Sequence, residues 1–501
     1  MATKVDGPHP ATMLTDTLVL TFKHLSTPDL IRASLVCRLW SLLALNMHWS
    51  KDWVTLSQVV ARLQGLNVTK EAQGQELGVV GKEAWITFNE HHAEKVQYLT
   101  LEVPLTQELC DLLKKFVSGT ERPGLPFPKL YALSIASKAM NWSDDEELMD
   151  TVKFILTSPL LSFIIDHHES SQPLRVNAIL KTLVDLAPQL RHLKAFQTSP
   201  RELIGNFPGG FGAFKQLTQL HVSEITYSAW KSLEGCPKLA EVMLQYSGMV
   251  WDGSVEMEDT TVLPTLHTLR IDNRCQTPTF PKAYIYPILL HTTMPSLRTI
   301  QLEITDSAPR FEMIIRRLQE NSPLIEELTW WYDCDETTSK IEHLLPFARL
   351  VRLTLIPFGS PCGPLTNAHM EEISRKLPRL KELYYRPRGD GIIVALTDAS
   401  LVTLARHSPL LEKVHLEMQL GNFTPDACVV DPHLSVRELS IRVLNLSEEA
   451  IPAFASFLTT IYPNVDASSF SVTVGHFDEA DQRRTQTSLT DAFIKARRGG
   501  T

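Results

Sequence analysis

The stretches "PTLHTLRI" (residues 264–271) and "PSLRTIQL" (residues 295–302) share one pattern. A proline is followed by apolar side chains at the third, sixth and eighth positions. In the first stretch, apolar Leu269 and Ile271 flank the charged Arg270. A period of two puts apolar side chains on one face and polar ones on the other, as in a half-buried β-strand. The pattern therefore predicts strands with one buried face and one solvated face.

The same frame recurs along most of the chain, at intervals of 22 to 34 residues. Its first apolar position falls at Val96, Leu130, Leu161, Leu190, Leu217, Leu239, Leu266, Leu297, Ile325, Leu350, Leu380, Leu411 and Val436. Repetition at this period is typical of a solenoid of stacked supersecondary units. The alternative is an ordinary alternation of strands and helices whose strands are loosely similar.

Helical patterns lie between several copies of the frame. Their apolar faces consist of Phe311, Ile314, Ile315 and Leu318, of Met370, Ile373 and Leu377, and of Leu401, Leu404 and Ala405. Thr366 or Asn367 is positioned to cap the second of these helices. Strand, helix and strand at this spacing predict parallel strands joined by crossover connections. Because the strands alternate, a barrel or a doubly wound sheet, which would bury both faces, is disfavoured.

The frame resembles the L-x-x-L-x-L signature of leucine-rich repeats. The resemblance implies an α/β solenoid with parallel strands on a solvated, concave face and helices outside. The Asn or Cys that usually follows the last Leu is generally missing here. We therefore expect irregular repeats and variable loops.

The segment before the repeats, residues 13–53, lacks this frame and carries the dense apolar run "LIRASLVCRLW" (residues 30–40). It predicts three short helices. "STPDL" is typical of a helix start, with Ser26 or Thr27 as the cap and Pro28 in the first helical position. About 40 residues cannot build a large core alone, so we expect this unit to pack partly on a partner helix.

This segment resembles an F-box, and "SLVCRLW" is its most specific part. In place of the family's opening Leu-Pro stands Met13-Leu14. The matching positions are Leu14, Leu18, Phe22, Leu25, Pro28, Leu30, Leu35, Val36, Cys37, Trp40 and Trp49. The stretch from Trp85 to Leu101 resembles the start of the repeats in fungal F-box proteins. The family binds the adaptor, and through it the cullin, of SCF-type ubiquitin ligases. The resemblance thus implies a non-enzymatic receptor that holds a protein substrate with its repeats.

Two other interpretations remain open. In the first, residues 13–53 are a helical cap on a leucine-rich-repeat interaction scaffold that has no ligase role, since open solenoid ends need caps. In the second, the chain is an α/β enzyme, although no catalytic motif supports this interpretation. Partial exposure of Leu18, Phe22 and Trp40 in the isolated chain would distinguish an adaptor-binding F-box from a cap.

The solvated strand positions indicate where a substrate would bind. The middle position of each strand is Thr100, Ser134, Ile165, Lys194, His221, Met243, Arg270, Gln301, Thr329, Thr354, Tyr384, His415 or Ser440. Aromatic and arginine side chains are the usual interface anchors. We therefore predict a substrate-binding patch at Trp331, Tyr384, Arg386, His415 and Arg442, although for any single one of them an ordinary strand residue is the favoured interpretation. "WWYDCDETT" (residues 330–338) either grips a basic peptide or places Trp330 in the core beside a solvated acidic loop.

Composition excludes several classes of function. The 501 residues are 44% hydrophobic and carry a net charge of −9, which disfavours nucleic-acid binding. Seven widely spaced cysteines without a C-x-x-C pair predict reduced thiols and no zinc site. The sequence contains no apolar run of membrane-spanning length and no signal-peptide core. We expect no catalytic residues, metal or cofactor, and a location in the cytoplasm or nucleus.

The sequence thus predicts five regions. They are a disordered N-terminus (1–12), an F-box (13–53), a helical linker (54–92), a leucine-rich-repeat-like solenoid (93–478) and a C-terminal tail (479–501).

Overall fold

A computed structural model gives the structure of the chain in two compact units, Met1–Leu239 and Ala240–Thr501. The residues that the structure describes are 17–37, 40, 43–44, 47, 53–56, 58–59, 93–103, 127–137, 149, 152–153, 155–156, 160–167, 176–197, 207–250, 260–272, 289–304, 308–333, 338–358, 365–388, 394–420, 431–444, 446–474 and 479–499.

The first unit contains an N-terminal helical segment and a parallel sheet whose strands follow one another in chain order, β1 to β6. Residues 17–22 are helical. The named elements are α2 (Thr27–Ser34), β1 (Val54–Thr55), η1 (Ala93–Lys95), β2 (Tyr98–Val103), β3 (Ala132–Ser137), β4 (Ser162–His167), α8 (Val176–Leu186), β5 (His192–Gln197), η2 (Gly210–Ala213), β6 (Gln219–Thr226), α9 (Tyr227–Ser232) and η3 (Leu233–Gly235).

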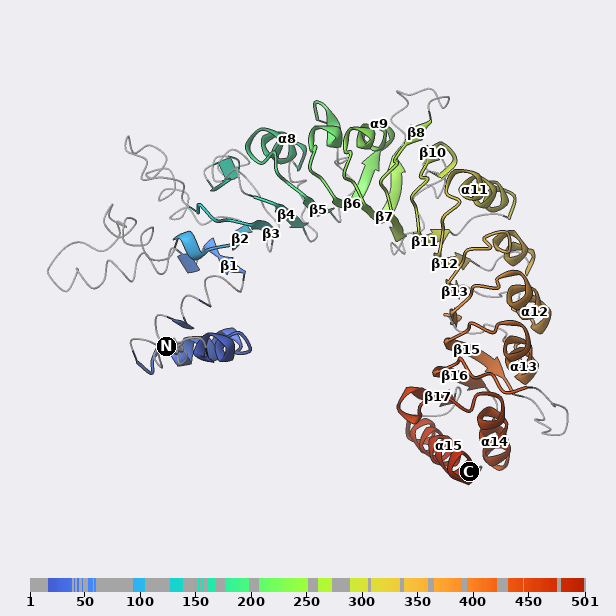
Figure 1. Cartoon of the computed structure of the whole chain (residues 1–501). Helices are drawn as coiled ribbons and strands as arrows, with labels where there is room; N and C mark the ends of the chain where they lie inside the picture. The colour runs from blue at the N-terminus through green and yellow to red at the C-terminus, as the bar shows by residue number, and fades with distance from the viewer. Residues whose placement is uncertain are drawn as a thin grey trace, which may run out of the picture. The chain divides into compact units, whose positions relative to one another are not determined.

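The second unit also contains a parallel sheet, and its helices lie on one side of that sheet (Figure 1). Its main sheet has the order β7-β9-β11-β12-β13-β14-β15-β16-β17, and β8 and β10 form a separate two-stranded ladder. The strands are β7 (Glu241–Val250), β8 (Thr261–Val262), β9 (Thr268–Asp272), β10 (Thr292–Thr293), β11 (Thr299–Ile304), β12 (Glu327–Asp333), β13 (Arg352–Phe358), β14 (Glu382–Tyr385), β15 (Lys413–Gln419), β16 (Glu438–Leu444) and β17 (Phe470–Val474).

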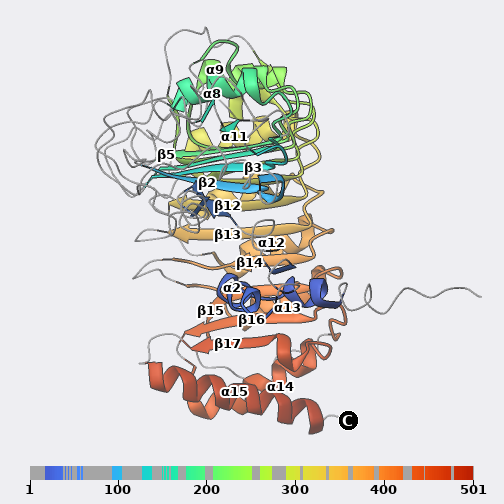
Figure 2. The ribbon, with the colours of Figure 1, turned by 90° about the vertical axis from the view of Figure 1, so that its left-hand side faces the viewer.

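Helices α11 to α14 connect strands of this unit. In Figure 2 the strands from β12 to β17 stack in chain order, with α14 and α15 at the end of the stack. The helical elements are α11 (Ala308–Asn321), η5 (Thr338–Leu344), α12 (Asn367–Lys376), α13 (Asp398–His407), η7 (Glu448–Ala450), α14 (Ile451–Ile461), η8 (Ala467–Ser469) and α15 (Glu479–Gly499). Parallel strands with crossover connections and one solvated face are the architecture of a leucine-rich-repeat solenoid, as predicted.

The repeat frame forms a strand at each predicted copy, and its first apolar position is buried at twelve of the thirteen copies. The exception is the copy at β4. There Leu160, Phe163 and Ile165 are buried, whereas Leu161 is only partly buried. Placing Ile165 on the solvated face was therefore wrong by one residue, and Ile164 occupies that position beside Ser134. A run of apolar residues gives no period-two signal, so the register of this strand could not be read from the sequence.

The predicted helices are present, and α12 begins after Thr366, one of its two predicted caps. The side chain of Thr366 caps α12 and that of Thr397 caps α13. Asn367 bridges these two repeats: its Oδ1 accepts hydrogen bonds from the Thr397 backbone N–H (3.1 Å) and the Ser400 hydroxyl (2.5 Å). An asparagine thus satisfies one backbone N–H and one hydroxyl between helix starts, although not at the usual position after the strand.

The sheet extends past the predicted frame at both ends. Strand β1 pairs with β2, and β17 pairs with β16. The segment predicted to be a tail forms helix α15, which packs on α14 and β17. In this contact the ring of Phe493 stacks on Phe470, with ring centroids 4.0 Å apart. Helix α15 therefore covers the apolar end of the C-terminal unit.

Candidate binding surfaces

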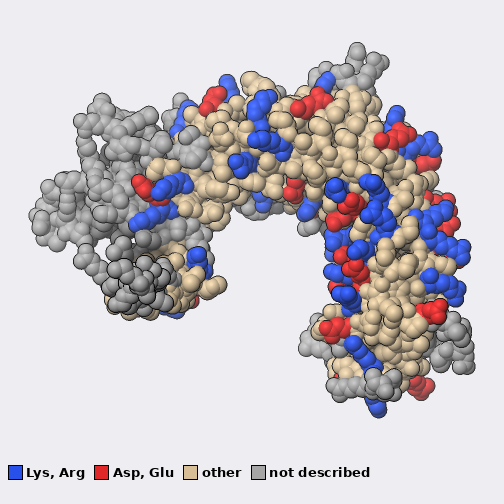
Figure 3. Space-filling view, in the orientation of Figure 1, with Lys and Arg blue, Asp and Glu red and all other residues tan. Residues whose placement is uncertain are grey.

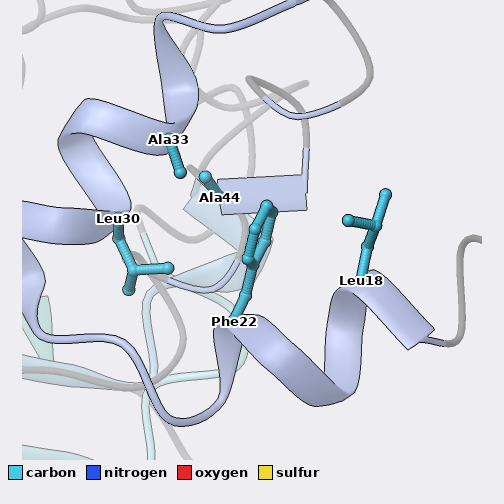
Figure 4. Close-up of a cluster of buried hydrophobic side chains, with 5 residues drawn as sticks. All are labelled: Leu18, Phe22, Leu30, Ala33 and Ala44. Carbon is cyan, nitrogen blue, oxygen red and sulfur yellow. The ribbon is translucent and has the colours of Figure 1, made fainter.

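The helical segment at residues 17–47 has a small apolar core of its own. Figure 4 shows five buried side chains: Leu18, Phe22, Leu30, Ala33 and Ala44. Partly buried side chains packed on this cluster are Leu25, Trp40, Leu43 and Met47. Phe22 meets Trp40 edge-on, with ring centroids 5.4 Å apart. Five of the predicted F-box positions therefore hold the helices together: Leu18, Phe22, Leu25, Leu30 and Trp40.

The local sequence explains where α2 starts. Ser26 precedes the helix, Pro28 lies in its first turn, and the Ser26 hydroxyl donates to the Asp29 carboxylate (2.6 Å). Asp29 also pairs with Arg32 (3.1 Å). An acidic group in the first turn is favourable at the positive end of the helix dipole. The helix starts after Ser26, as predicted, but the Ser26 side chain makes no capping hydrogen bond to the backbone, and Pro28 is the second helical residue, not the first.

Exposed apolar side chains lie at the other end of α2. Leu35 is 83% exposed and Val36 is 62% exposed, and Cys37 beside them is also exposed. Leu20, on the first helix, is 58% exposed. Burying a large apolar side chain is worth about 1.5–3 kcal/mol, so two adjacent exposed ones are an unfavourable surface for an isolated helical segment. We call Leu35, Val36 and Cys37 the apolar turn.

Partial exposure of Leu18, Phe22 and Trp40 was the criterion that would favour an adaptor-binding F-box over a cap, and only Trp40 meets it. Leu18 (9%) and Phe22 (1%) are buried, and Trp40 is only partly exposed. Their i, i+4 spacing marks an apolar face but does not say whether that face packs within the chain or on a partner. The surface available to a partner comes instead from the apolar turn. Leu14 and Trp49, two further predicted F-box positions, lie outside the described residues.

The five residues of the predicted substrate patch all lie on the solvated face of the C-terminal unit. Trp331 is on β12, Tyr384 on β14, His415 on β15 and Arg442 on β16. Arg386 follows β14 by one residue and is exposed. Outward positions on neighbouring strands are aligned in rows, so that Tyr384 lies between Thr354 and His415. In Figure 3 basic and acidic side chains are interspersed over this side of the unit.

Two of the predicted residues form an aromatic pair. The rings of Tyr384 and His415 stack with centroids 4.2 Å apart and an interplanar angle of 17°. His415 Nε2 lies 3.1 Å from a carboxylate oxygen of Glu438. Burial lowers the pKa of His415 and outweighs the opposing effect of Glu438. The pair is thus a flat, uncharged aromatic surface at neutral pH.

An ion-pair ladder crosses the amino-terminal ends of the same strands. Its members are Glu327, Arg352, Glu382, Lys413 and Glu438. Arg352 contacts Glu327 (3.2 Å) and Glu382 (2.5 Å), and Lys413 contacts Glu382 (3.7 Å) and Glu438 (3.4 Å). The hydrogen bond from Arg352 lowers the pKa of Glu382. The charges in this row are therefore largely compensated from within the protein.

Trp331 contacts an arginine that was not predicted. The guanidinium of Arg388 lies over the indole ring, 4.7 Å from its centroid. The indole Nε1 is buried and has no hydrogen-bond partner among the described residues. Trp330, by contrast, is in the core (1% exposed), as one of the two interpretations predicted. Arg388 could have been found by extending the alternation Glu382, Tyr384, Arg386 by one step, but the prediction went only one residue past the frame, to Arg386.

The described residues contain no group of three or more His, Cys, Asp or Glu side chains able to hold a metal ion. Among the helices of the described part of the chain, none is both long and apolar enough to cross a membrane.

Comparison with known proteins identifies one domain. Residues 15–49 match the F-box domain family. This stretch includes the helical cluster, α2 and the apolar turn. No curated protein matches the chain.

Solved structures with a similar course of the chain include two of low identity. A leucine-rich-repeat domain of APL1B has 12% sequence identity and a TM-score of 0.29, with 70% of this chain and 84% of that chain covered. The Rad7 and Elc1 complex of yeast contains a chain with 10% identity and a TM-score of 0.31, with 76% and 92% covered.

Proposed function

We propose that this chain is the substrate-recognition subunit of an SCF-type cullin–RING ubiquitin ligase. In this proposal the F-box binds the ligase adaptor and the strand face of the repeats binds a protein substrate. The observation that carries it is the coincidence of the F-box match at residues 15–49 with the exposed apolar turn at Leu35 and Val36.

The proposed role requires no chemistry from this chain. A receptor of this kind raises the effective concentration of a substrate lysine near the ubiquitin-charged enzyme. It needs one surface for the adaptor and a separate one for the substrate. The apolar turn and the strand face of β12 to β16 are two such surfaces on different elements. The chain would act in the cytoplasm or nucleus, where the other ligase subunits are.

Adaptor binding by the purified full-length chain tests the proposal. We expect a complex with the SCF adaptor in isothermal titration calorimetry, and a loss of at least about 100-fold in affinity for the double variant Leu35→Asp/Val36→Asp. Each substitution removes an apolar contact worth about 1.5–3 kcal/mol and forces a charge into the interface. Because both side chains are exposed, the F-box core is left intact.

The matched control places the same charges on another exposed apolar pair. Leu410→Asp/Leu434→Asp changes two side chains that are 48% and 64% exposed in the C-terminal unit. It should bind the adaptor as the unmodified chain does. Leu18 and Phe22 are unsuitable targets, because charges there would break the helical cluster. If the unmodified, folded chain shows no adaptor binding, the helical segment is a cap and the chain is a leucine-rich-repeat interaction scaffold.

A further inference from the structure

The basic side chains on the strand face of the C-terminal unit fall into two groups. Four of them have a carboxylate within 4.0 Å: Arg270 with Glu241, Arg352 with Glu327 and Glu382, Lys413 with Glu382 and Glu438, and Arg442 with Glu417. Arg386 and Arg388 have no ion-pair partner among the described residues, and both are exposed. The two uncompensated cations are neighbours on one face, separated only by the buried Pro387.

The backbone fixes the position of this pair. Beyond the end of β14, the N–H groups of Arg386 and Arg388 still donate to the carbonyls of Leu355 and Pro357 on β13, at 3.1 and 2.8 Å. The chain therefore remains extended and keeps its alternation. Arg386 and Arg388 are thus held on the sheet, not on a free loop, and project on the same side as Tyr384.

A third group beside the arginines also lacks a partner. Trp331 Nε1 is a hydrogen-bond donor only, it is buried, and no described residue accepts from it. A buried donor without an acceptor is unfavourable, and a ligand oxygen would satisfy it once a covering side chain moves aside. Two free cations and one free donor in one place call for an anionic, acceptor-rich ligand and would repel a basic one.

We propose, on the basis of the receptor role above, that the substrate segment bound at Arg386, Arg388 and Trp331 is an acidic extended peptide. Two of its carboxylates pair with the two guanidiniums, and one of them accepts from the indole N–H. Arg388 reaches across to β12, over Trp331. Two separate carboxylates therefore fit these cations better than one doubly charged group. The stacked rings of Tyr384 and His415 provide the neighbouring surface for an apolar side chain of the peptide.

The acidic residues of the ion-pair ladder do not oppose this binding. Glu382 is four residues before Arg386 on the same strand, which is about 13 Å in an extended chain. This separation exceeds the screening length of about 8 Å at physiological ionic strength. Glu417, in the row of Arg386, is buried and paired with Arg442.

A display library of random 12-residue peptides, selected on the immobilised full-length chain, tests the proposal. We expect the selected peptides to be acidic. The best of them, labelled with fluorescein, is then titrated by fluorescence anisotropy. Its Kd should rise at least tenfold for Arg386→Gln/Arg388→Gln and by about tenfold for Trp331→Phe, since charge-assisted hydrogen bonds are lost in each case.

The control is Arg270→Gln/Arg298→Gln, which removes two positive charges that already have carboxylate partners. Its Kd should change less than twofold. Selection of neutral or basic peptides overturns the proposal, as does an equal weakening by the control, which would indicate attraction by net charge alone. Binding that requires phosphoserine in place of Glu in the selected peptide also overturns it, in favour of a phosphate site. Adaptor binding is measured separately on each variant, so that failure of the peptide site is distinct from failure of the F-box.

Discussion

At the scale of single residues, His369 makes the stability of the start of helix α12 depend on pH. Its Nδ1 accepts a hydrogen bond from the Thr366 backbone N–H (3.1 Å), and the Thr366 hydroxyl accepts in return from the His369 N–H (3.4 Å). This is a capping box with histidine in the place of the usual Glu or Gln. The acceptor is available only while the ring is neutral.

Burial lowers the pKa of His369 below its ordinary value of 6.5, against the opposing effect of Glu372 and Glu342. Protons therefore bind the unfolded state preferentially. The stabilisation of the folded chain by the neutral His369 ring is complete above pH 6.5 and is lost as pH falls from there toward the lowered pKa. We expect His369→Gln, which keeps the acceptor but does not titrate, to lose less free energy of unfolding between about pH 7.5 and about pH 5.5 than the unmodified chain. Urea unfolding at several pH values measures this, and parallel pH profiles for the two proteins would contradict it.

Single residues also show why the sites were only partly predictable. The shared face of the predicted substrate-binding residues could be read from the sequence, because side chains at period-two positions point to the same side of a strand. The roles of Leu18 and Phe22 were missed because their spacing fits both an internal core and a partner contact. The missing partners of Arg386 and Arg388 could not be foreseen, since they follow from which strands become neighbours.

At the scale of elements, two glycines allow a close approach of η2 and η3. A Cβ on Gly235 would lie 2.7 Å from the Cα of Gly212, and one on Gly212 would lie 2.4 Å from the Ser232 carbonyl oxygen. Both obstacles are backbone atoms, which cannot rotate away. Neither glycine stood out in the sequence, because close contact between elements leaves no local pattern.

We expect Gly235→Ala to destabilise the chain by about 3 kcal/mol, at the upper end of the overpacking range. Gly209→Ala is the matched control. Its Cβ meets only the Ala213 side chain at 3.6 Å, and its φ of +78° costs about 1 kcal/mol for a residue with a side chain. Urea titration of both variants compares the two effects. Equal destabilisation by the two variants would show that the close contact at Gly235 costs no more free energy than the left-handed backbone conformation at Gly209.

Strands and helices were the most predictable elements. A strict L-x-x-L-x-L frame fixes both the existence of a strand and its register, and it failed only at β4, where Leu160 to Ile165 is almost continuously apolar. Strands β1 and β17 lie outside the frame and were not predicted. In β17 the short helix η8 separates the buried Val465 from the strand, so the spacing of the frame is lost.

At the scale of the whole molecule, a repeat array transmits stability mainly between neighbouring repeats. Helix α15 is the terminal element of this chain of contacts. It buries Leu489 and Phe493, and Arg497 donates to the Val465 carbonyl (2.6 Å). The stability of the last repeats should therefore depend on this helix more than that of repeats farther away.

We expect Phe493→Ala to cost about 3–5 kcal/mol locally, because it removes a fully buried ring. Hydrogen exchange measured by mass spectrometry should show the largest loss of protection in β17 and β16, and a loss that fades toward β9. A uniform loss over the C-terminal unit would indicate that it unfolds as one cooperative body. Thr490→Ala, which changes a partly buried residue whose hydroxyl bonds only to the Gln486 carbonyl of the same helix, should leave the exchange pattern nearly unchanged.

The residue-for-residue alignment of β12 to β16 has a consequence for the shape of any bound segment. Alternate strands of a sheet are about 9.6 Å apart. A polyproline II helix advances about 9.3 Å in one turn of three residues and returns its side chain to the same side. A peptide running along a row of this face would thus present every third side chain to every second strand. Prolines at the intervening positions would preorganise such a peptide for binding. A peptide in the β-strand conformation, running along the same row, would align its side chains with the strands of the sheet far less often.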